Sequence, residues 1–235
     1  MGMEFTKLLT SNFGQKYSEI LGIDVSSQDE GEIFKWFLAS VLFGAPITET
    51  AVIKTYKCFE NLKVLTPQKI LEIGWDGLVE MLDAGSYTRY DFKTADKLLE
   101  VMGNLVTKYE GSLNLLHEQA TDSSDLEKRL KELGKGIGDV TVSIFLRELR
   151  GIWKKANSKP TPLVVLAAKN LGIIKEGRPH EVLRELKRFW TENKVSEKDF
   201  VNFETALLRV GKDFCRKMRC RQCKLRQFCS VTALA

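Results

Sequence analysis

The sequence predicts an all-α protein, and three observations point to that fold class. Apolar residues recur at helical spacing in several segments, as in the run from Ile33 to Leu42. No segment combines sustained period-two alternation with the turn pairs that join strands. The 235 residues include only five prolines and seventeen glycines, which excludes a collagen-like or broadly disordered chain. With a mean helix length of about 11–12 residues, roughly ten helices are expected.

The expected helices follow one another with short connections. The clearest apolar stripes lie in 30–44, 124–133 and 198–212. Two polar segments, 24–29 and 154–160, are expected to mark boundaries. In chain order, the expected helices are 3–12, 30–44, 48–62, 67–72, 75–82, 88–109, 111–118, 124–133, 139–150, 162–171, 179–191 and 198–212.

The segment 163–168 (LVVLAA) is the one place where a buried strand competes with a helix. Thr161 and Pro162 precede it, and they are typical of an N-cap followed by proline in the first helical turn. Gly172 supplies a helix stop. We therefore expect a buried helix here.

Composition limits the cellular setting and the partners. Lys and Arg exceed Asp and Glu by 36 − 31 = 5, a mild positive charge that is compatible with nucleic acid. No apolar run approaches the roughly 20 residues that a membrane span needs, so no membrane partner is expected. The first residues lack a basic stretch followed by an apolar one, so we expect a cytoplasmic protein, which in a prokaryote would be associated with the nucleoid. We also expect a monomer.

Four of the five cysteines lie within fifteen residues. Cys215, Cys220, Cys223 and Cys229 read C-x4-C-x2-C-x5-C, a spacing that suits zinc or an iron–sulfur cluster. A disulfide framework is the competing interpretation, and a reducing compartment disfavours it. Only one C-x2-C pair is present and a single tight loop holds all four thiols, which favours a compact [4Fe–4S] cluster over zinc. The same loop contains six cations, which suit a negatively charged cluster or phosphates: Arg216, Lys217, Arg219, Arg221, Lys224 and Arg226.

A glycine-rich turn separates two expected helices at residues 133–146 (LGKGIGDVTVSIFL). Gly136 and Gly138 let the backbone approach a partner closely, and the next helix starts with unpaired N–H groups that favour a phosphate. Ile137 is expected to point into the core, and Lys135 can add a cationic contact. An ordinary tight turn between two helices is the alternative. With no strand before it, the turn is unlike a Rossmann or P-loop motif.

The hairpin, the capped helix and the four-cysteine loop together resemble the helix-hairpin-helix DNA glycosylase superfamily, in its endonuclease III branch. Segments 34–56, 78–102 and 207–215 extend the resemblance over nearly the whole chain. It implies a base-excision-repair protein that binds double-stranded, damaged DNA with the target base flipped out, and a [4Fe–4S] cluster held by the four cysteines. The implied lobes are a six-helix barrel over 30–152, with the hairpin at about 124–150, and a cluster lobe of 1–29 and 153–235 with its loop at 215–229.

The chain departs from the family at the catalytic positions. Val140 stands where bifunctional members have a Schiff-base lysine, and we expect this valine to be buried. Thr161 stands where the catalytic aspartate is expected, and residues 151–175 contain no Asp at all. Asp139 is the nearest substitute carboxylate, although capping of its own helix is the more ordinary role. The first cysteine gap is also x4 where the family usually has x6, which keeps zinc open.

The sequence is therefore compatible with two functions. The first is a glycosylase or lyase of altered chemistry. The second is a non-catalytic protein that binds DNA or DNA damage on the same scaffold, with the cluster as a structural support. An RNA-directed or protein-binding role is a weaker third option. His117 and His180 are expected to be surface residues and not metal ligands.

Overall fold

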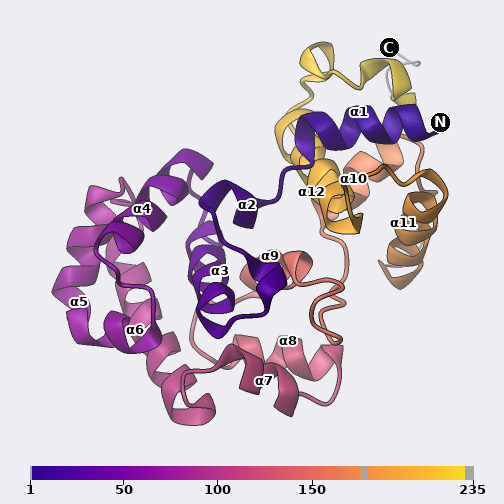
Figure 1. Cartoon of the computed structure of the whole chain (residues 1–235). Coiled ribbons are helices and arrows are strands. Elements are labelled where there is room, and N and C mark those ends of the chain that lie inside the picture. Colours follow the sequence, from indigo (N-terminus) through magenta and orange to yellow (C-terminus); the bar gives the residue numbers. More distant parts are fainter. Residues whose placement is uncertain (1, 176–178, 231–235) are drawn as a thin grey trace. The chain divides into compact units, whose positions relative to one another are not determined.

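The computed structural model describes residues 2–175 and 179–230, without the side chains of residues 179 and 180, and over these residues the chain is helical with no strand (Figure 1). The all-α prediction is confirmed. Within the described residues, the α-helices are α1 (Met3–Phe13), α2 (Tyr17–Leu21), α3 (Glu30–Phe43), α4 (Glu49–Asn61), α5 (Pro67–Ala84), α6 (Asp91–Tyr109), α7 (Leu113–Gln119), α8 (Ser123–Lys131), α9 (Asp139–Glu148), α10 (Pro162–Asn170), α11 (Pro179–Asn193) and α12 (Phe200–Val210). None of the described helices is long and apolar enough to cross a membrane.

The chain divides into two compact units. The central unit is the continuous stretch Leu21–Ser158, and the terminal unit combines Met1–Ile20 with Lys159–Ala235. The hairpin lies in the central unit, whereas the four-cysteine loop lies in the terminal unit.

The core of the central unit forms around α3, which is buried along most of its length. Trp36 donates its indole N–H to the Phe145 carbonyl of α9 at 3.0 Å, and the Tyr87 hydroxyl donates to the Leu42 carbonyl at 2.6 Å. Both side chains are fully buried, so each hydrogen bond satisfies a polar group that would otherwise be costly in an apolar core. The Trp36 bond fixes α9, and with it the hairpin, on the core, and the Tyr87 bond fixes the connection between α5 and α6 on α3.

Helix α5 runs through two expected helices, 67–72 and 75–82. Gly74 interrupts it with φ +68°, a left-handed conformation that glycine adopts at little cost. The sequence pattern therefore placed the break correctly. It missed α2, a helix of five residues that is too short to show an apolar period.

The terminal unit joins the two ends of the chain. Helix α1, from the N-terminal part of the chain, packs along α12, and α10 also packs on α12 (Figure 1). Phe5 and Leu9 of α1 are buried in the same apolar core as Phe203 and Leu207 of α12. Asn202 also donates from Nδ2 to the Gly14 carbonyl at 2.8 Å, which ties the end of α1 to the start of α12.

A close backbone contact at the end of α12 positions the cysteine loop. A Cβ added to Gly211 would stand 2.1 Å from the Leu163 carbonyl oxygen of α10. Because a backbone oxygen cannot move aside easily, we expect Gly211→Ala to destabilise the protein by about 2–4 kcal/mol.

The matched control is Gly103→Ala, within α6. A Cβ at Gly103 meets nothing within 4 Å, so this substitution should stabilise the helix by about 0.5–1 kcal/mol. Urea unfolding of both variants measures the difference, and equal stability of the two would contradict the close contact at Gly211.

His117 makes the central unit acid-sensitive. Its ring stacks on Trp153 with centroids 4.5 Å apart, and its Nε2 is buried without a hydrogen-bond partner. Burial lowers the pKa of His117, and the nearby Lys155 lowers it further, while Glu118 acts in the opposite direction. The expected surface position of His117 is therefore wrong in part, because the ring is partly buried.

We expect stability to be complete above pH 6.5, the ordinary histidine pKa, and to fall as the pH drops below it toward the lowered folded-state pKa. In that pH range His117 is protonated in the unfolded chain and stays neutral in the folded chain, so protonation favours unfolding. His117→Phe retains the stacking and removes the titration, so its stability should lose this pH dependence. Urea midpoints between pH 7 and pH 5 test this, and parallel profiles for both proteins would contradict it.

Candidate functional site

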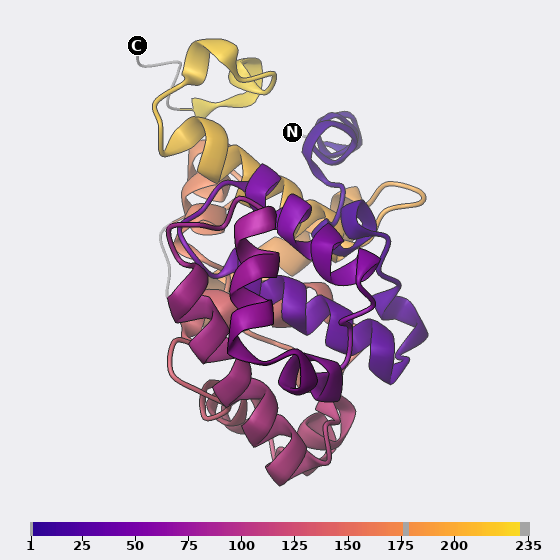
Figure 2. The ribbon, with the colours of Figure 1, turned by 90° about the vertical axis from the view of Figure 1, so that its left-hand side faces the viewer.

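The four-cysteine loop is built on a fixed base. A single π-helical turn, Gly211–Cys215, follows α12, and short 3-10 turns lie at Cys220–Gln222 and Arg226–Phe228 (yellow in Figure 2). Leu225 inserts fully into the core of the terminal unit. Cys215, Cys223 and Cys229 pack against that core, whereas Cys220 does not.

The four thiols interact electrostatically with one another. Burial raises the pKa of Cys215, and the charges of the other three cysteines raise it further, while a hydrogen bond with Asn170 lowers it. Burial likewise raises the pKa of Cys223, with added repulsion from Cys229 and Cys220. Four thiolates gathered in this way repel one another, and a cationic centre among them would reverse the repulsion. No disulfide joins these cysteines.

Within the described residues, no three His, Cys, Asp or Glu side chains come together around a point where one metal ion could sit. The donor set is nonetheless chemically suited to a soft metal, since it consists of four thiols on one loop. The residues that would hold such a metal are Cys215, Cys220, Cys223 and Cys229.

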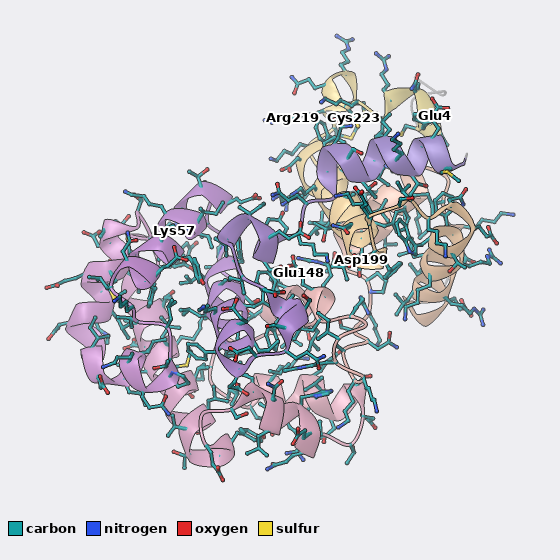
Figure 3. The ribbon with its side chains drawn as sticks, in the orientation of Figure 1. Glu4, Lys57, Glu148, Asp199, Arg219 and Cys223 are labelled. Atoms are coloured by element: carbon teal, nitrogen blue, oxygen red, sulfur yellow. The ribbon has the colours of Figure 1, made fainter. Side chains whose placement is uncertain are left out.

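The cations of the loop face solvent. All six are exposed, and Arg219 is labelled with Cys223 on this loop in Figure 3. Lys217 lies 3.5 Å from Asp213, and Lys224 donates to Asn12 Oδ1 at 2.7 Å. These contacts are with exposed or polar groups and leave the positive charge available to an anionic partner.

The hairpin has the conformation that its glycines predict. Gly136 adopts φ +86°, and Ile137 is buried and donates its backbone N–H to the Gly134 carbonyl at 3.2 Å. Lys135 is exposed, and its backbone N–H donates to Glu100 Oε2 at 3.1 Å. Gly138 is the N-cap of α9, and a Cβ there would meet nothing within 4 Å. The backbone at Gly138 is therefore open to a partner.

Lys97 of α6 is a site residue that the sequence pattern missed. Its side chain crosses Gly136, with Cε 2.7 Å and Nζ 3.3 Å from the place where a Cβ of residue 136 would stand. Burial lowers the pKa of this amine. No sequence signal could have found Lys97, because it is a single lysine on an amphipathic helix about forty positions before the hairpin.

Two expectations about the start of α9 are wrong. Val140 is 61% exposed and not buried, because the second residue of α9 points away from the core that Ile137 enters. Asp139 does not cap its helix, since the N-cap is Gly138 and no side chain caps it. The Asp139 carboxylate instead lies 2.5 Å from Lys131 Nζ at the end of α8.

Thr161 has the capping role that its position predicts. It is the N-cap of α10, and its hydroxyl accepts the Val164 N–H at 3.4 Å, with Pro162 next in the helix. Thr161 lies in the terminal unit, whereas Val140 lies in the central unit. Of the two histidines, His117 is engaged with Trp153, and the side chain of His180 lies outside the described residues.

The described part of the chain is thus an all-helical protein of two compact units, one with an open glycine hairpin and one with a loop of four thiols and six cations. No protein-family model matches the chain, and no curated protein matches it significantly.

Proposed function

We propose that this chain is a duplex-DNA-binding protein of the base-excision-repair type, built on the two-lobed helix-hairpin-helix glycosylase scaffold and stabilised by a [4Fe–4S] cluster. In this proposal it lacks the standard glycosylase and lyase chemistry. The open hairpin carries the proposal: Gly136 is left-handed, Gly138 is uncovered, and the amine of Lys97 lies beside Gly136.

The hairpin supports phosphate binding for three physical reasons. The N–H groups at the start of α9 are not used by the helix and carry partial positive charge. The absence of a side chain at Gly138 lets a phosphate oxygen approach these groups closely. Lys97 and Lys135 add positive charge beside the turn. Such contacts recognise the DNA backbone and not the base sequence, so the binding is expected to be salt-sensitive and largely sequence-independent.

The donor set of the loop supports the cluster over zinc. A single zinc with bonds of about 2.3 Å to four thiolates would bring the sulfurs to roughly 3.8 Å from one another. In a [4Fe–4S] cluster each thiolate binds a different iron, so the sulfurs stand further apart. The chain has only one C-x2-C pair and holds all four thiols in one tight loop, a pattern that favours the cluster. When bound, the cluster would supply a structural link between the loop and the core of the terminal unit.

Val140 and Thr161 stand where the family has its catalytic lysine and aspartate, and these two residues support a non-catalytic protein. A valine has no nucleophile or proton to offer, and Thr161 is a neutral helix cap. Residues 151–175 also contain no acidic residue. The second function, a lyase of altered chemistry, is favoured by one observation, the amine of Lys97. Its lowered pKa makes more of the neutral amine available, and a neutral amine can condense with the sugar aldehyde of an abasic site, releasing water.

Binding and trapping experiments with the whole protein test both functions. A fluorescent duplex carrying an abasic site measures binding, and sodium borohydride reduces any imine between protein and sugar to a stable amine. We expect binding that weakens steeply with salt and no covalent adduct. An adduct that disappears in Lys97→Gln would replace the non-catalytic function by the lyase, and absence of binding would reject both functions.

A further inference from the structure

One large apolar side chain stands out from the cysteine loop. Met218 is 84% exposed, more than any other large hydrophobic residue described, and Met3 follows at 65%. Its neighbours in sequence are Arg216, Lys217 and Arg219, all exposed. This apolar side chain lies among cations and is exposed to solvent. It would gain hydrophobic free energy only if a binding partner buried it.

The backbone beneath Met218 is fixed. The residue adopts φ +54°, a left-handed conformation that is unfavourable for a side chain of this size. Its N–H donates to the Cys215 carbonyl at 3.2 Å, and the Arg219 N–H donates to the Phe214 carbonyl at 3.0 Å. Phe214 in turn packs edge-on against Phe13 of α1, with ring centroids 5.6 Å apart. Glycine is the usual residue at such a turn, so a methionine here carries a conformational cost, and its exposed side chain buries little surface within the fold to offset that cost.

We propose that Met218 is an apolar wedge that enters a base step of duplex DNA while the cations beside it bind the flanking phosphates. This inference rests on the proposed DNA-binding function and extends it to a named contact. Apolar residues, methionine among them, are inserted between base pairs by proteins that kink the duplex, and the cost of unstacking is offset by the new contacts. Methionine suits the role because its unbranched, polarizable side chain adapts to the flat faces of bases.

The charge pattern favours DNA over an acidic protein surface as the partner. Cations lie on both sides of Met218 along the chain. A DNA duplex carries phosphates on both sides of any base step, so this arrangement matches a polyanion that extends past the wedge in both directions. The Lys217–Asp213 contact at 3.5 Å joins two partly exposed groups, so phosphate can displace it at little cost.

The test is Met218→Ala, measured on a duplex with 2-aminopurine at its centre, whose fluorescence rises when the base is unstacked. We expect the wild type to raise this fluorescence and Met218→Ala to lose most of the rise, with binding about tenfold weaker because one large apolar side chain is no longer buried. The salt dependence of binding should be unchanged by Met218→Ala, whereas Arg219→Gln should lower its slope by about one.

Two control variants separate the side chain from the backbone. Met218→Gly relieves the left-handed strain and should lose fluorescence as Met218→Ala does, while Met3→Ala removes a similarly exposed methionine on α1 and should behave as wild type. Binding without a fluorescence rise, or with a rise that survives in Met218→Ala, would overturn the wedge and leave DNA binding in place. Absence of any DNA binding would overturn the proposed function together with the wedge.

Discussion

Cys220→Ala is expected to remove the proposed [4Fe–4S] cluster and to unfold much of the terminal unit. Cys220 is the one ligand candidate that does not pack on the core, so its replacement disturbs the packing least and isolates the loss of a thiolate. A structural metal held by thiolates contributes on the order of 10 kcal/mol of folding free energy. We expect the purified variant to lose its iron, its sulfide and the broad absorption at roughly 400 nm that marks cysteine-held clusters.

The matched control is Cys58→Ala in α4 of the central unit. Cys58 is partly exposed, and its thiol donates only to the Lys54 carbonyl at 3.4 Å, within its own helix. This variant should retain full metal content and a wild-type melting profile. Calorimetry and limited proteolysis should show the terminal unit of Cys220→Ala lost while the central unit still melts cooperatively. Full iron content and unchanged melting in Cys220→Ala would exclude a metal centre that needs all four cysteines, and stoichiometric zinc in the wild type would replace the cluster.

Gly138→Asp is expected to abolish most of the proposed DNA binding without loss of stability. Asp is among the best N-cap residues, and the open space at Gly138 accepts a side chain, so the fold should be retained or slightly stabilised. The new carboxylate would stand where the phosphate is proposed to bind. At roughly 5 Å and an effective dielectric of about 20, two negative charges repel by ~3 kcal/mol, and after screening we expect binding on the order of thirtyfold weaker than in Gly138→Asn.

Gly138→Asn is the comparison because it has the same shape and capping ability without the charge. Fluorescence anisotropy at one fixed salt concentration measures both variants, and urea unfolding checks that they are equally folded. Equal affinities would show that no phosphate sits at the start of α9, and the hairpin would then be an ordinary turn. Gly136 is less suitable for this test, because a side chain there would be strained at φ +86° and would collide with Lys97.

The sequence predicted the helices well because their boundaries depend on local chemistry. Thr161 and Pro162 begin α10 as expected, and the glycine at position 74 breaks α5 where two helices were predicted. The division of the chain at residues 20 and 158 was harder to place, because which helices share a core depends on contacts between distant segments. Helix α2 was missed for a different reason, since five residues are too few for a period to appear.

The candidate site was less predictable at the level of single side chains. The orientation of Val140 follows from how α9 lies on α3, which no local pattern reveals. Lys97 reaches the hairpin only because α6 packs beside it, and the closeness of its amine to Gly136 is a tertiary contact. The exposure of Met218 depends on a left-handed turn that the sequence would assign to a glycine.

The terminal unit has a consequence for the order of events during synthesis. Arg209 of α12 donates to the Phe13 carbonyl of α1, a partner 196 residues away in the chain. Helix α1 therefore leaves the ribosome long before its packing partner exists, whereas the central unit is continuous and can fold as soon as it emerges. The four cysteines follow α12, so the proposed metal centre would be inserted only after α1 has waited for its partner helices. A nascent chain halted before α10 should thus contain a folded central unit and an α1 that is open to proteases and chaperones.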